Sequence, residues 1–114
     1  MGAFGIRRPL RMLSHRLGLD ESQTAVLAEF LDDLRTEQAQ AEVDKRRASK
    51  LLAGAMAGET FDSEAATQAT KLRAQASERV IEHTAKGLRA LHAVLDAEQR
   101  QRFVTLMRAG PLSF

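Results

Sequence analysis

The three histidines are the residues of this chain best suited to acid–base catalysis or metal binding near neutral pH. His83 and His92 are nine positions apart, so the two lie on opposite sides of one predicted helix and cannot share a metal ion. His15 can approach His92 only through the fold. No His-x-x-x-His or His-Glu-x-x-His spacing occurs, and the chain has no cysteine. The sequence therefore predicts no metal site and no cofactor.

Hydroxyl and carboxylate side chains are present but stand outside any recognisable catalytic pattern. We find no nucleophile elbow, phosphate-binding loop or glycine-rich turn beside them. We therefore expect no catalytic residue, and a protein that is not an enzyme.

Arginines dominate the start of the chain, where Arg7, Arg8, Arg11 and Arg16 all precede the first acidic residue. One interpretation of residues 1–18 is a basic arm that binds nucleic acid or an anionic membrane surface. The other is a short helix over residues 9–17 that packs its leucines on the body while its arginines face water. We favour the second, because no aromatic platform accompanies the charges and the segment is short. Nucleic acid is not expected as a partner.

Two segments that repeat almost letter for letter predict where helices begin. The first reads Leu-Asp-Glu-Ser-Gln and the second Leu-Asp-Ala-Glu-Gln. In each, the aspartate is a good N-cap, the glutamine three residues on can reach back to the cap's own N–H, and the leucine can pack at the helix start. The motif residues are Leu19, Asp20, Gln23, Leu95, Asp96 and Gln99. Asp62 marks a third helix start, without the glutamine.

Long apolar stripes predict helices over residues 20–57 and 62–94, followed by a final helix over 96–109. Gly87 interrupts the second stripe and indicates a close helix approach or a bend. Gly18 and Gly110 are expected to end helices. The first stripe comprises Leu27, Leu31, Leu34, Ala41, Ala48, Leu52 and Ala55, with Gln38 and Lys45 in register. The second comprises Ala69, Leu72, Ala76, Val80, Thr84, Leu88, Leu91 and Leu95, widened by Ile81, and the final helix is expected to bury Phe103, Leu106 and Met107.

These elements predict a single all-α domain over residues 1–114, with four helices. Two helices of similar length joined by a short turn form an antiparallel hairpin, here comprising residues 19–109 with the final helix. A lone hairpin leaves its stripes half covered, so we predict a homodimer. No apolar run reaches the roughly 20 residues of a membrane span. The segment 1–13 lacks a secretory pattern, so we expect a cytoplasmic protein if Met1 is the native start and a periplasmic one if a leader was removed.

A mixed apolar and basic surface in the middle of the hairpin is the best candidate for binding a partner polypeptide. Its expected contributors are Val43, Lys45, Arg46, Arg47, Lys50, Leu72, Arg73, Arg79 and Ile81. Acidic residues beside these cations also fit a plain solvated face with i,i+4 pairs.

The paired Leu-Asp-x-x-Gln segments resemble the Leu-Thr-x-x-Gln motifs of the Spy/CpxP family, with aspartate in place of threonine. The resemblance covers residues 17–109 and follows the family's order of motif, long helix, turn, long helix, motif and final helix. It implies a curved, hairpin-shaped homodimer that holds unfolded clients without ATP, or a stress-regulatory adaptor. Relatives of the CnrX and ZraP type sense heavy metals through histidines, but the His-x-x-x-His ligands of that branch are missing here.

Overall fold

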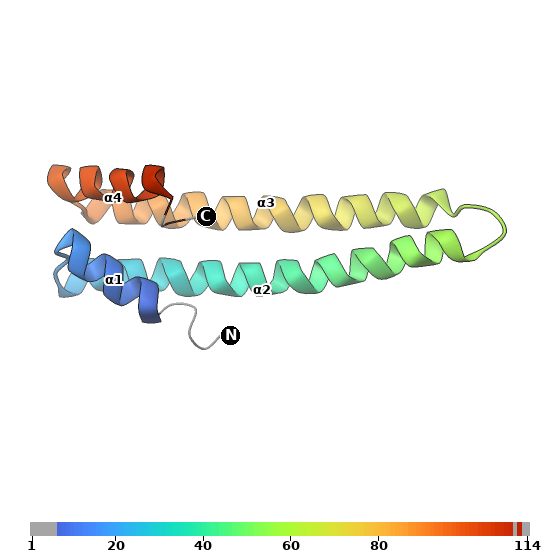
Figure 1. The fold of residues 1–114 in the computed structure, drawn as a ribbon, viewed down its shortest axis with the longest axis horizontal. Helices are drawn as coiled ribbons and strands as arrows, with labels where there is room; N and C mark the ends of the chain where they lie inside the picture. The colour runs from blue at the N-terminus through green and yellow to red at the C-terminus, as the bar shows by residue number, and fades with distance from the viewer. Residues whose placement is uncertain (1–6, 111, 113–114) are drawn as a thin grey trace. The chain divides into compact units, whose positions relative to one another are not determined.

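The computed structural model describes residues 7–110 and residue 112. The described residues form four α-helices and include no β-strand, which confirms the predicted all-α fold (Figure 1). The helices are α1 (Arg7–Leu17), α2 (Glu21–Ala57), α3 (Ser63–Val94) and α4 (Ala97–Ala109). Helix α1 begins two residues earlier than predicted, because a proline at position 9 is tolerated in a first helical turn. Residues 1–6 of the predicted basic arm lie outside the described residues.

The described residues divide into two compact units. The first unit comprises the described part of Met1–Arg35 and His83–Phe114, which contains α1, the beginning of α2, the end of α3 and α4. The second unit is Thr36–Glu82, which contains the rest of α2, the turn and the beginning of α3. Within each unit, the segments of α2 and α3 run antiparallel (Figure 1).

Large aliphatic and aromatic side chains form the core of the first unit. Helix α1 contributes two fully buried leucines, so it packs on the body while its four arginines remain exposed, as the second interpretation of this segment expects. The three predicted core residues of α4 differ in their exposure. Phe103 is buried, Leu106 is half-buried and Met107 is exposed, so the assignment of Met107 to the core is wrong. The buried apolar residues of this unit are Leu13, Leu17, Leu27, Phe30, Leu31, Leu34, Leu91, Leu95 and Phe103.

Gly87 lies directly against an aromatic ring. A Cβ atom added at Gly87 would stand 1.9 Å from Cδ1 and 2.6 Å from Cγ and Cε1 of Phe30, a buried residue of α2. Ordinary contacts between carbon atoms are about 3.5–4.0 Å. Only glycine therefore allows the Phe30 ring to sit on α3 at this point, which confirms the predicted close approach.

The second unit has a core of small side chains, because its buried apolar residues are all alanines: Ala48, Ala55, Ala69 and Ala76. Its buried face on α2 passes through Asp44, whereas the sequence placed Lys45 and Leu52 on that face. Lys45 is exposed and Leu52 is 47% exposed, so both assignments are wrong, as is that of Gln38, which is exposed too. Residues three and four positions apart both stay on one side of a helix. The structure uses the alternative three-residue step, which buries a short carboxylate and leaves the long lysine in water.

Ile81, expected to widen the stripe of α3, is 64% exposed. The remainder of that stripe is confirmed, with every other member buried or half-buried.

Candidate functional site

Both repeated motifs form capping boxes. Asp20 Oδ1 accepts a hydrogen bond from the N–H of Gln23 at 2.8 Å, and Gln23 Oε1 accepts one from the N–H of Asp20 at 3.0 Å. The corresponding distances for Asp96 and Gln99 are 2.8 and 2.9 Å. Each box satisfies backbone donors that have no partner inside the helix. The predicted capping is therefore confirmed at α2 and α4.

The two motif glutamines also bind each other. Gln23 Nε2 donates to Gln99 Oε1 at 2.8 Å and to the carbonyl oxygen of Val94 at 2.7 Å. Gln99 Nε2 donates to Gln23 Oε1 at 3.1 Å and to the carbonyl oxygen of Gly18 at 3.1 Å. Each amide thus accepts through its oxygen and donates through its nitrogen, a combination that a carboxylate cannot provide. The motifs tie the starts of α2 and α4 together, a contact that the sequence did not predict.

Local hydrogen bonds at the first motif change the pKa of Asp20. The N–H of Gln23 and then the hydroxyl of Ser22, which donates at 2.9 Å, hold the pKa of Asp20 below its ordinary value of 3.8. Hydrogen bonds to the charged form of the carboxylate stabilise it, which is why they lower its pKa. The motif leucines lie beside these caps, with Leu95 buried and Leu19 half-buried.

The residues predicted to bind a partner all lie in the second unit. Val43 is exposed and Leu72 is half-buried. The cations of α2 and Arg73 of α3 are exposed, and they are Lys45, Arg46, Arg47, Lys50 and Arg73. Together with exposed Ile81, these side chains give the second unit a solvent-facing mixture of apolar and positively charged groups.

Two of the predicted partner-binding cations pair with Asp44, Arg47 at 3.9 Å along α2 and Arg79 from α3. Arg79 makes the pairing between the two helices. Its Nη2 lies 2.6 Å from Oδ2 of Asp44, and its Nε lies 3.5 Å from Oε1 of Glu37. Asp44 is only 3% exposed and also accepts a hydrogen bond from Gln40 at 3.3 Å. A buried carboxylate needs a charged partner, and Arg79 provides it across the two helices. The guanidinium of Arg79 is therefore engaged in holding α2 against α3 within the second unit.

Three large apolar residues near the turn are exposed, and the sequence did not single them out as a surface. Leu52 and Met56, four residues apart on one side of α2, are 47% and 75% exposed, and Phe61 is 57% exposed. The N–H of Asp62 donates to the carbonyl oxygen of Ala55 at 3.1 Å, which returns the chain beside the end of α2. Their position next to the predicted turn could have indicated this exposure, since side chains at helix ends have fewer neighbours to cover them. We call Leu52, Met56 and Phe61 the turn cluster.

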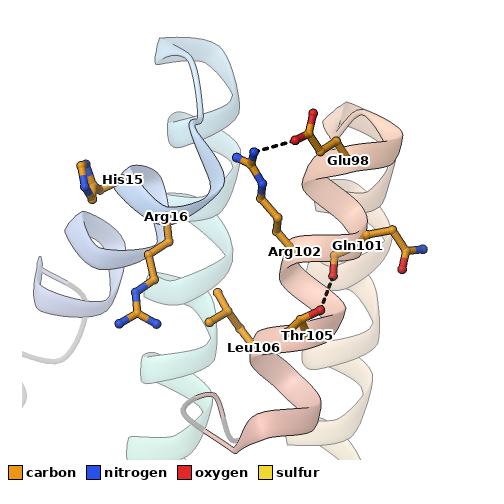
Figure 2. Close-up of a pocket in the computed structure, with 7 residues that line it drawn as sticks. All are labelled: His15, Arg16, Glu98, Gln101, Arg102, Thr105 and Leu106. Atoms are coloured by element: carbon orange, nitrogen blue, oxygen red, sulfur yellow. Dashed lines mark hydrogen bonds and ion pairs between the residues drawn. The ribbon is translucent and has the colours of Figure 1, made fainter.

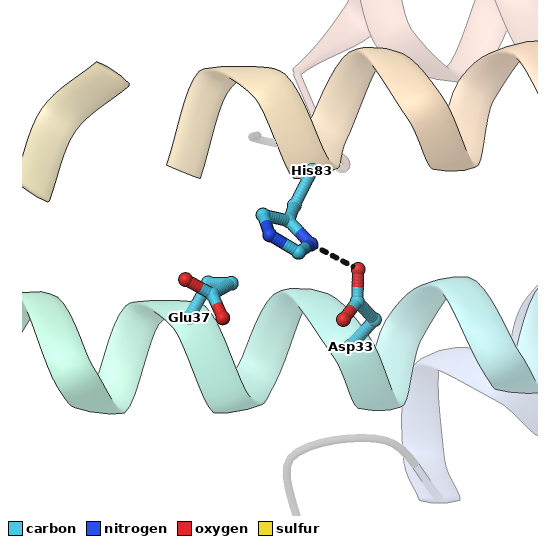
Figure 3. A group of neighbouring side chains, drawn as sticks. All are labelled: Asp33, Glu37 and His83. Atoms are coloured by element: carbon cyan, nitrogen blue, oxygen red, sulfur yellow. Dashed lines mark hydrogen bonds and ion pairs between the residues drawn. The ribbon is translucent and has the colours of Figure 1, made fainter. Parts of the chain in front are cut away.

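His83 is paired with a carboxylate in the first unit. Its Nδ1 lies 2.6 Å from Oδ2 of Asp33, and both side chains are partly exposed. Figure 3 shows the two side chains facing each other from α3 and α2. An imidazole and a carboxylate are both ligands for divalent transition metals. Histidine spacing alone could not reveal this pair, because the second ligand comes from a different helix.

The structure and its motifs define a class of all-α proteins in which two capping boxes are hydrogen-bonded to each other. Among the described residues, no helix combines the length and the apolar character needed to cross a membrane. The chain belongs to the LTXXQ motif family, whose sequence model, described as LTXXQ motif family protein, matches residues 5–107. Spy/CpxP-like proteins belong to this family, which confirms the resemblance, and it is not a family of enzymes. Neither the curated proteins nor the solved structures provide a match.

Proposed function

We propose that this protein is a Spy/CpxP-like ATP-independent chaperone or regulatory adaptor that binds other polypeptides on the surface of its second unit. The observation that carries this proposal is the exposure of large apolar side chains over a core of alanines. They are Val43, Leu52, Met56, Phe61 and Ile81. Catalysis has no part in the proposed function.

This surface suits a partner that has no fixed shape. Met56 has an unbranched, polarisable side chain that adapts to different apolar groups, and Phe61 offers a large contact area. The nearby cations Arg46, Arg47 and Lys50 are exposed and can steer the approach of acidic segments. Surfaces of this kind tolerate varied partners, because apolar contact provides affinity without strict geometry.

We further propose that the protein is a homodimer. Exposed apolar groups in a soluble protein mark surfaces that a second chain or a partner covers. Sedimentation equilibrium at micromolar concentration should give twice the chain mass of 12.6 kDa. A species at the monomer mass across that range would contradict the dimer but not the binding of clients.

The test of the proposed function is suppression of aggregation of a chemically denatured client, without ATP and at a near-stoichiometric ratio. Wild-type protein should slow the aggregation measured by light scattering. Replacing Met56→Ser and Phe61→Ser together should weaken this effect several-fold, since both side chains are exposed and their loss leaves the core intact. Met107→Ser is the matched control, because it removes an exposed methionine from the first unit.

Variants of two arginines of α3 should distinguish client binding from the folding stability of the protein. Arg73→Gln removes an exposed cation and should weaken capture of an acidic client with no change in the free energy of unfolding. Arg79→Gln removes the cation nearest to the buried Asp44 and leaves only the more distant Arg47, so it should destabilise the protein by about 2 kcal/mol. If Arg79→Gln kept full stability and lost only client binding, its pairing with Asp44 would have been misjudged.

A second candidate function is a metal-responsive regulator of the CnrX and ZraP type. The contact between His83 and Asp33 is the observation that favours it. The two functions predict opposite results in a zinc titration, which is described below.

A further inference from the structure

Helices α1 and α4 border an open groove in the first unit, with a volume of about 790 Å³ (Figure 2). From α1 it is lined by His15 and Arg16. From α4 it is lined by Gln101, Arg102, Thr105 and Leu106, together with Glu98 at one end. Figure 2 shows Arg16 and Leu106 projecting from the two helices into the space between them.

The two helices that form this groove are strongly basic. Together α1 and α4 carry seven arginines and a single acidic residue, Glu98. The rest of the chain has ten basic and fourteen acidic residues. The net charge of +2 therefore conceals a marked separation of charge, and the groove lies within its positive part.

The groove presents two guanidinium groups, of which one is already ion-paired and the other is not. Arg102 Nη2 lies 2.6 Å from Oε1 of Glu98, so one carboxylate is already bound at this wall. Both side chains are at least half exposed, and an exposed pair of this kind is weak and exchanges readily with other carboxylates. Arg16, on the opposite wall, is exposed and has no ion-pair partner among residues 7–110 and 112. The half-buried Leu106 adds an apolar contact between them.

We propose that the groove between α1 and α4 docks an acidic peptide segment of another protein, with a carboxylate on Arg16 and an apolar side chain on Leu106. A guanidinium fork binds a carboxylate through two parallel hydrogen bonds. The negative charge of Glu98 repels a continuous phosphate backbone. A peptide can instead place its carboxylates away from Glu98. A membrane surface fits less well, because Leu13 and Leu17 of α1 are fully buried and cannot enter a bilayer. This site is in the first unit and is independent of the client-binding surface proposed above.

The test uses the full chain and a fluorescein-labelled peptide of alternating glutamate and leucine, with binding followed by fluorescence anisotropy. Arg16→Gln should weaken binding about tenfold, the loss expected for one charge-assisted contact. Arg8→Gln is the matched control, since it removes the same charge from an exposed position of α1 outside the groove and should change binding less than twofold. Glu98→Gln should strengthen binding about two- to threefold, because it frees Arg102 for the peptide. The same change at Glu64, on α3, should have no effect.

Three results would overturn the proposal. One is equal loss of binding in Arg16→Gln and Arg8→Gln, which would mean attraction by general charge alone. Another is equal binding of a peptide with glutamine in place of every glutamate. The third is tighter binding of a DNA duplex or of phosphatidylglycerol vesicles, lost in Arg16→Gln, which would assign the groove to a different class of partner. Circular dichroism of each variant checks that the helices are intact.

Discussion

Gly87→Ala offers the sharpest test of the packing in the first unit. In an open helical position this change stabilises a protein by up to about 1 kcal/mol, because alanine is the better helix former. At Gly87 the new methyl group would stand 1.9 Å from a ring carbon of Phe30, so the ring must move by more than 1 Å to restore an ordinary contact. Overpacking of this kind costs about 1–3 kcal/mol. Subtracting the gain in helix propensity from this steric cost leaves an expected net destabilisation of up to about 2 kcal/mol.

Gly54→Ala is the matched control, since nothing lies within 4 Å of a Cβ atom added at that position of α2. It should stabilise the protein by about 0.5–1 kcal/mol through helix propensity alone. Thermal unfolding followed by circular dichroism distinguishes the two variants. At about 4 °C for each kcal/mol, Gly87→Ala should melt below the wild-type protein and Gly54→Ala above it.

A double-mutant cycle locates the cause at the Phe30 ring. Phe30→Ala removes the ring, and with it the atoms nearest to the new methyl group, so Gly87→Ala should be less destabilising by at least about 1 kcal/mol in that background. Equal stabilisation by Gly87→Ala and Gly54→Ala would refute the steric account. Equal destabilisation with and without Phe30 would assign the effect to a different contact.

Three further predictions concern the caps and the histidine. Asp20→Ala and Asp96→Ala should each lower the free energy of unfolding by about 1 kcal/mol in urea titrations, and full stability with loss of partner binding would contradict their capping role. Because hydrogen bonds lower the pKa of Asp20, the unfolded chain binds more protons than the folded one in acid. The stability that this carboxylate contributes is present above pH 3.8 and is lost as pH falls through the lowered pKa, so the advantage over Asp20→Asn should shrink between pH 6 and pH 3. Calorimetry with zinc, nickel or copper should show no stoichiometric binding tighter than micromolar, whereas such binding abolished by His83→Ala would favour the metal-responsive function.

Local signals in the sequence predicted the ends of the helices. An aspartate and a glutamine three residues later fall within one helical turn, so the capping boxes at Asp20 and Asp96 depend on neighbours in the chain alone. The stops at Gly18 and Gly110 were predicted for the same kind of reason, because both adopt the left-handed backbone conformation with φ of 62° and 94°. The close approach at Gly87 was indicated as one of two possibilities, but its partner was not.

Pairs between helices were decided only by the tertiary structure. The amides of Gln23 and Gln99 are 76 residues apart in the sequence, and Arg79 and Asp44 are 35 apart. Predicting such a pair requires the rotation of each helix about its axis and the register between helices. In the second unit, the apolar pattern of α2 fits a step of three residues and a step of four residues about equally well. Alanines are too small and too frequent to show which of the two steps leads to the buried face. The buried Asp44, with a cation facing it from α3, decided which step was used, and that choice left Lys45 and Leu52 in solvent.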